Sequence, residues 1–91
     1  MTDSFYRVSA LHQTPSYGCT DAVAKVSTNK PDHYYAIMSQ YGCSKDATSP
    51  AGAIRNMLKD HGCYAVSIRL MPQAEGFEAY WHQPWAGDWK L

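Results

Sequence analysis

The chain has 91 residues, which is enough for one domain and too few for two. Its apolar fraction of 45% and its aromatic fraction of 13% exclude a disordered chain. Eight Lys and Arg residues balance eight Asp and Glu residues, so the chain as a whole has no attraction for nucleic acid or anionic lipid. We therefore expect a single domain over residues 1–91 that does not bind nucleic acid sequence-specifically.

We expect the chain to carry no targeting signal. Residues 1–4 lack the basic and apolar regions of a secretory signal peptide. No apolar run approaches the roughly 20 residues that a membrane-spanning helix needs. Cys19, Cys43 and Cys63 are an odd number of cysteines at wide spacing, which is unlike a disulfide framework. These features predict a cytoplasmic protein in a reducing compartment, with no membrane partner.

The first half of the chain predicts three strands. Apolar and polar residues alternate over residues 5–11, which is typical of a strand. Residues 20–28 fit a strand or a short helix, and the β-branched residues near their end favour the strand. Residues 33–41 alternate again, and the turn signals at 29–32 would join them to the preceding strand as a hairpin.

A helix is predicted over residues 50–61. Ser49 is a favourable N-cap residue, and Pro50 suits the first helical position because its missing amide hydrogen would be unpaired there. Apolar residues recur at helical spacing on one narrow face, and Gly62 follows where a left-handed residue commonly ends a helix. This helix has one side suited to packing on a sheet.

The last part of the chain predicts a strand over residues 63–71, a turn at 72–76 and a final strand over 77–82. The fold class is therefore α+β, an antiparallel sheet of about five strands in the order β-β-β-α-β-β with one helix packed on one face. A single helix covers only part of such a sheet. We expect the opposite face to meet water, a second copy in a homodimer, or a protein partner.

The sequence offers no catalytic constellation. It has no glycine-rich phosphate loop, no G-x-S-x-G motif and no paired carboxylates, so we predict no catalytic residue and no cofactor. A zinc site would need Cys19, Cys43, Cys63 and His61. Zinc ligands usually come in close pairs, and only His61 and Cys63 are close in the sequence. We therefore expect no metal, and a small cysteine- or zinc-dependent enzyme stays as an alternative.

Aromatic residues are crowded near the end of the chain. Tyr80, Trp81, Trp85 and Trp89 lie within ten residues, and Trp is strongly enriched at the centres of protein interfaces. Such rings also fill the core of a small domain. Neighbouring tyrosines in the strand at 33–41 must face opposite sides, so one of them is expected to lie away from the helix. The candidate partner-binding residues are Tyr34, Tyr35, Arg69, Tyr80, Trp85 and Trp89.

The second half of the chain resembles a known family in its layout. The pattern A-T-S-P-A-G-A-I-R-N-M-L, then C-Y-A-V-S-I-R-L, a turn and G-F-E-A-Y-W-H-Q is similar over residues 47–82 to small phage-encoded anti-CRISPR proteins. The resemblance implies a non-catalytic inhibitor that binds a bacterial CRISPR effector or another defence complex and blocks its nucleic-acid-binding surface sterically. The neutral charge departs from the acidic surfaces of DNA mimics.

A second function class stays open from the residues alone. A homo-oligomer could sequester a nucleotide signal by stacking the base on the aromatic cluster. Its phosphate would then be bound by arginine, since a guanidinium group matches phosphate geometry. The candidates for that contact are Arg7, Arg55 and Arg69.

Overall fold

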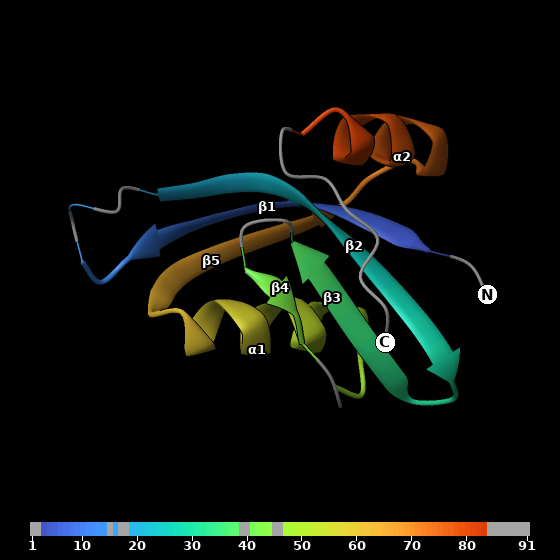
Figure 1. Ribbon diagram of the computed structural model, residues 1–91, viewed down its shortest axis with the longest axis horizontal. Helices are drawn as coiled ribbons and strands as arrows, with labels where there is room; N and C mark the ends of the chain where they lie inside the picture. The colour runs from blue at the N-terminus through green and yellow to red at the C-terminus, as the bar shows by residue number, and fades with distance from the viewer. Residues whose placement is uncertain (1–2, 15, 17–18, 39–40, 45–46, 84–91) are drawn as a thin grey trace.

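The computed structural model describes residues 3–14, 16, 19–38, 41–44 and 47–83. In chain order its elements are β1 (Ser4–His12), β2 (Cys19–Lys30), β3 (His33–Met38), β4 (Gly42–Cys43), α1 (Pro50–Asp60), β5 (Cys63–Leu70) and α2 (Gln73–Trp81). The strands form one antiparallel sheet in the order β4-β3-β2-β1-β5 (Figure 1). The predicted α+β class and the antiparallel sheet of five strands are confirmed. The predicted order β-β-β-α-β-β with one helix is wrong, because β4 precedes α1 and a second helix, α2, follows β5.

The ambiguous segment at residues 20–28 is a strand, as the β-branched residues indicated. It forms the central part of β2, which pairs with β1 on one side and β3 on the other. A turn at Pro31 and Asp32 joins β2 to β3, and Asp32 has a φ of 60°. Proline sets the first turn angle and aspartate tolerates the left-handed conformation, so this pair suits the turn. The predicted hairpin is confirmed.

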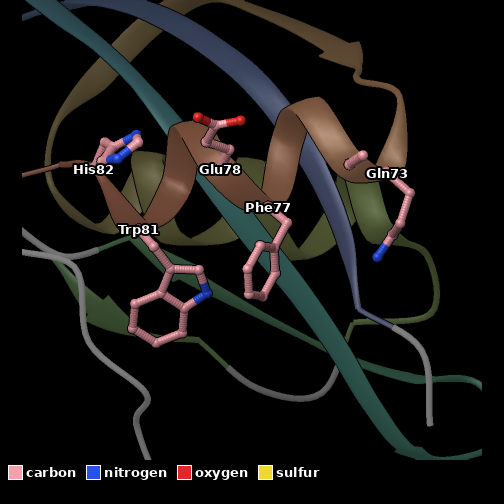
Figure 2. A pocket seen from close by; sticks show the side chains of 6 residues that line it. Gln73, Phe77, Glu78, Trp81 and His82 are labelled. Carbon is pink, nitrogen blue, oxygen red and sulfur yellow. The ribbon is translucent and has the colours of Figure 1, made fainter.

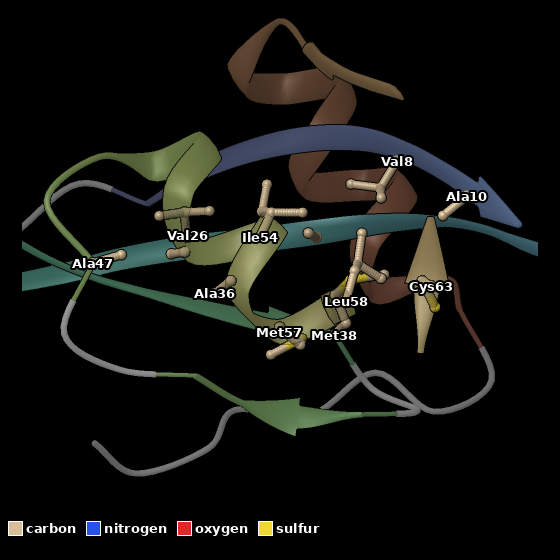
Figure 3. Packing of buried hydrophobic residues seen from close by; sticks show 12 residues of the cluster. Val8, Ala10, Val26, Ala36, Met38, Ala47, Ile54, Met57, Leu58 and Cys63 are labelled. Carbon is tan, nitrogen blue, oxygen red and sulfur yellow. The ribbon is translucent and has the colours of Figure 1, made fainter. Parts of the chain in front are cut away.

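The helix α1 is built by local signals. The Ser49 hydroxyl accepts a hydrogen bond from the Gly52 amide at 3.0 Å, and Pro50 occupies the first helical position. Gly62 takes a φ of 75° just after the helix, where a side chain would be strained. The buried face of α1 packs on the sheet and forms the larger of two cores (Figure 3). Its buried residues are Ala53, Ile54, Met57 and Leu58.

The predicted final strand over residues 77–82 is wrong, because this segment belongs to α2. The alternation of Phe77, Ala79 and Trp81 suggested a strand. Phe77 and Trp81 are also four residues apart, however, which places them on one face of a helix. Gly76 and Tyr80 have the same spacing and are both buried. The predicted strand, turn and strand over residues 63–82 are therefore a strand followed by a helix.

The second helix covers part of the sheet face opposite α1. It packs over β1 and β2 and closes a smaller core. That core contains Phe5, Val23, Ile37, Met71 and Tyr80. The expectation that this whole face is open is therefore wrong at the α2 end, and it holds at the other end, where Arg7, Ser9 and Leu11 are exposed. Neither helix described in the structure is long and apolar enough to cross a membrane.

Candidate protein-binding surface

Two large rings project into solvent from α2. Phe77 is 56% exposed and Trp81 is 39% exposed, which is unusual for side chains of this size. They lie one helical turn apart and point from the same side of the helix (Figure 2). Their ring centroids are 6.3 Å apart. Together they form a continuous apolar patch rather than two isolated exposed residues.

The patch borders a shallow, open hollow along α2. Its volume is about 670 Å³, and its surface is mostly apolar. Polar groups stand at its border, because Glu78 and His82 line it beside the two rings. An apolar centre with a polar rim is the usual anatomy of a protein interface. The lining residues are Gln73, Ala74, Phe77, Glu78, Trp81 and His82.

Buried side chains hold both rings from beneath. The Phe77 ring meets the Phe5 ring edge-on at a centroid distance of 6.0 Å. The Trp81 ring meets the Tyr80 ring edge-on at 5.1 Å. Phe5 and Tyr80 are buried in the core between α2 and the sheet. Edge-to-face contacts of this kind fix ring orientation, so the exposed rings are positioned before any partner arrives.

Lys25 provides a further contact below Trp81. Its side chain extends from β2 under α2 and is only 3% exposed. Its ammonium nitrogen lies 5.1 Å from the Trp81 ring centroid and 5.4 Å from the Tyr80 ring centroid. These distances are within the range of cation–π attraction. The Trp81 ring is therefore held by a cation on the sheet side and left open toward solvent.

The predicted partner-binding residues differ in how far they are exposed to solvent. Tyr80 is fully buried and Tyr35 is 6% exposed, so the expectation that their rings are available to a partner is wrong. Tyr34 is half-buried and packs against the core under α1. Trp85 and Trp89 lie outside the described residues. Arg69, the remaining candidate, is exposed on β5.

Sequence reasoning missed Phe77 and misplaced Trp81. The alternation over residues 77–82 predicts a strand and does not single out Phe77 as a binding residue. Two signals in the sequence could have identified the pair. Phe77 and Trp81 are four residues apart, as on one face of a helix, and they follow Pro72, since proline is common at the start of a helix. Once the segment is a helix, Phe77 and Trp81 share a face, and Gly76 and Tyr80 share another.

Two arginines meet on the open end of the same sheet face. Arg69 of β5 lies directly opposite Arg7 of β1, and both are exposed. Like charges in this arrangement repel each other. The Asp21 carboxylate offsets part of this repulsion from 3.7 Å, although such an exposed pair contributes little. Arg55 is exposed on α1, so the sequence-predicted phosphate candidates do not all converge.

The cysteines and histidines show one cluster near the end of α1. The Tyr41 ring stacks on the His61 ring at 4.5 Å, and its hydroxyl group lies 3.8 Å from the Cys63 sulfur. Cys43 lines the same polar hollow as His61. Among the described residues, no three His, Cys, Asp or Glu side chains are placed to hold a metal ion. The Cys19 side chain lies outside the described part of the chain.

Comparisons with protein families, curated proteins and solved structures find no match to this chain.

Proposed function

We propose that this chain is a non-catalytic inhibitor that binds a bacterial protein complex through the outer face of α2. The observation that supports the proposal is the exposed pair Phe77 and Trp81. Large rings at the centre of an apolar patch are the side chains that contribute most to protein binding. Their contacts with Phe5 and Tyr80 reduce the side-chain entropy that binding would otherwise cost.

The first target to test is a bacterial defence effector, because the sequence pattern of residues 47–82 resembles anti-CRISPR proteins, even though Gln73–Trp81 is a helix here. In this role the chain acts in the cytoplasm of the host bacterium and occludes the surface on which the effector binds nucleic acid. The zero net charge favours steric occlusion over imitation of DNA. The proposal includes no bond-making step and no cofactor.

The direct experiment mixes the purified chain with purified CRISPR effector complexes and isolates the products by size-exclusion chromatography. A pull-down from a bacterial lysate, followed by mass spectrometry, covers other targets. We expect a stoichiometric complex and a loss of DNA binding by the effector. If no stoichiometric protein partner appears in either format, the proposal is wrong.

Variants then locate the binding surface. Phe77→Ala and Trp81→Ala should each weaken partner binding about tenfold or more, as expected for central interface residues. Leu11→Ala is the matched control, because Leu11 is 47% exposed on β1 and does not line the α2 hollow. The double variant Trp85→Ala/Trp89→Ala tests the tail. Binding that survives both α2 variants would exclude this surface.

A second candidate function is supported by the facing pair Arg7 and Arg69. An anion bound between them would relieve their repulsion, which fits the nucleotide-sequestering alternative. Thermal shift with a panel of nucleotides tests it. Arg7→Gln and Arg69→Gln should abolish a shift that Arg55→Gln retains. A wild-type chain whose melting temperature responds to no nucleotide would exclude this candidate.

A further inference from the structure

The strand β5 forms a long edge of the sheet. Among the described residues it pairs only with β1, and its other side has no strand beside it (Figure 1). The opposite edge strand, β4, has two residues, whereas β5 has eight. An edge of this length presents a row of unpaired amide and carbonyl groups, which can pair with another extended chain.

The register shows which residues offer those groups. The Met71 amide donates to the Phe5 carbonyl at 2.9 Å. Hydrogen-bonded and non-hydrogen-bonded pairs alternate along an antiparallel ladder, so Arg69 and Ser67 direct their backbone groups toward β1. The residues between them direct theirs outward. These outward residues are Val66, Ile68 and Leu70.

The side chains of this edge are mainly aliphatic. Val66 and Ile68 are half-buried against the core under α1, and Leu70 is 64% exposed. Arg69 is the one charged residue of the segment 66–70, and it lies on the opposite face. Natural edge strands are commonly protected by lysine or proline, and neither occurs in this segment.

Two features limit the regular part of the edge. Ala65 has a φ of 53°, and the register of β5 against β1 shifts beside it, which marks a bulge. At the other end, the Met71 amide is used by Phe5. The regular outward edge therefore runs over residues 66–70. Ile68 is its central residue, so an antiparallel self-pairing that uses the whole edge has its symmetry axis at Ile68.

We propose that two copies of this chain dimerise by antiparallel pairing of β5 about a two-fold axis at Ile68. In this register Ile68 faces its own counterpart, and Val66 faces Leu70 of the second copy. Ser67 then faces Arg69 of the second copy, which avoids like-charge contact. An axis at Arg69 would place two arginines directly opposite each other and is disfavoured. The pairing satisfies the edge backbone groups and covers the exposed Leu70.

Sedimentation velocity over a wide range of protein concentration tests the dimer. Ser67→Lys places a cation opposite Arg69 twice per dimer and should weaken dimerisation about tenfold or more. Ser67→Glu should strengthen it. Ser9→Lys is the matched control, because Ser9 faces Ser67 from β1 and is one strand away from the edge. This control should dimerise like the wild-type chain.

Leu70→Pro is a second probe of the same edge. Proline at this position removes an amide that points away from β1, so no hydrogen bond between β5 and β1 is lost. The circular dichroism spectrum of the monomer should therefore stay unchanged while dimerisation falls. A wild-type chain that stays monomeric at every concentration overturns the proposal. So does a dimer that both Ser67→Lys and Leu70→Pro leave intact. The dimer proposal is also overturned if the chain stays monomeric and β5 pairs with a strand of another protein. In that case the edge of β5 is a binding site for that protein. The dimer is independent of the α2 surface proposed above.

Discussion

The side-chain amide of Gln83 pairs with the backbone of Val23 as a neighbouring strand would. Its Oε1 accepts from the Val23 amide at 2.7 Å, and its Nε2 donates to the Val23 carbonyl at 3.1 Å. Among the described residues, β3 pairs with β2 only as far as Lys25. Gln83 thus supplies hydrogen bonds to β2 two residues beyond the end of this ladder. Because Gln83 follows α2, the contact also ties the end of that helix to the sheet.

Replacing Gln83 should destabilise the fold. Gln83→Ala leaves the amide and carbonyl of the buried Val23 without these bonds, at a cost of about 1–3 kcal/mol. Gln83→Glu should cost at least as much at neutral pH, because it loses the donor and places a charge beside the Val23 carbonyl. Urea unfolding measures both. Gln73→Ala, at an exposed position of α2, is the control. Equal stability of all four chains would contradict the assignment.

The close approach of α2 to β1 depends on Gly76. A Cβ at this position would overlap the Cβ and ring of Phe5. Gly76→Ala gains about 1 kcal/mol of helix propensity. The overlap should outweigh this gain, since overpacking typically costs about 1–3 kcal/mol and the nearest atom cannot rotate away. We expect a lower midpoint of thermal unfolding. A midpoint equal to or above that of the wild-type chain would show that α2 shifts freely.

The parts of the fold that sequence predicts are those encoded locally. The start of α1 is specified by Ser49 and Pro50, and its end by Gly62, all within one turn of the helix ends. The first strands are specified by alternation within each segment. These signals need no knowledge of what packs on them, and the structure follows them closely.

The end of the chain could not be predicted because its deciding contacts are distant in sequence. The spacing of Phe77 and Trp81 fits both a strand and a helix. What favours the helix is the packing of Gly76 on Phe5 and the bonds of Gln83 to Val23. The aromatic crowding at the end of the chain is visible in the sequence. Which of the Phe77, Tyr80 and Trp81 rings faces solvent depends on the helix, so their exposure could not be assigned from the sequence.

Lys25 should contribute to stability through its buried stem as well as through its ammonium group. Its methylene groups are buried below α2, and its ammonium group contacts two rings. Lys25→Met retains the stem and removes the cation, so it should destabilise the fold less than a variant that loses both. Lys25→Ala also opens a cavity and should cost about 2–4 kcal/mol. Urea unfolding ranks the two variants. Equal destabilisation of the two variants would mean that loss of the cation, which both share, matters more than loss of the packing.

The stability of the fold should fall at alkaline pH because of Tyr6. Burial raises the pKa of the Tyr6 phenol above its ordinary value, and the nearby Tyr34 adds to the shift. The unfolded chain releases this proton near pH ~10. The folded chain holds the proton to higher pH. The stability that protonated Tyr6 contributes is therefore complete below the unfolded pKa and is lost as pH rises through the folded pKa.

Tyr6→Phe should therefore make the free energy of unfolding fall less steeply above about pH 10. Urea titrations at increasing pH measure the slope, and Tyr64→Phe controls for loss of an exposed phenol. The same alkaline slope in both variants would show that Tyr6 does not carry this pH dependence.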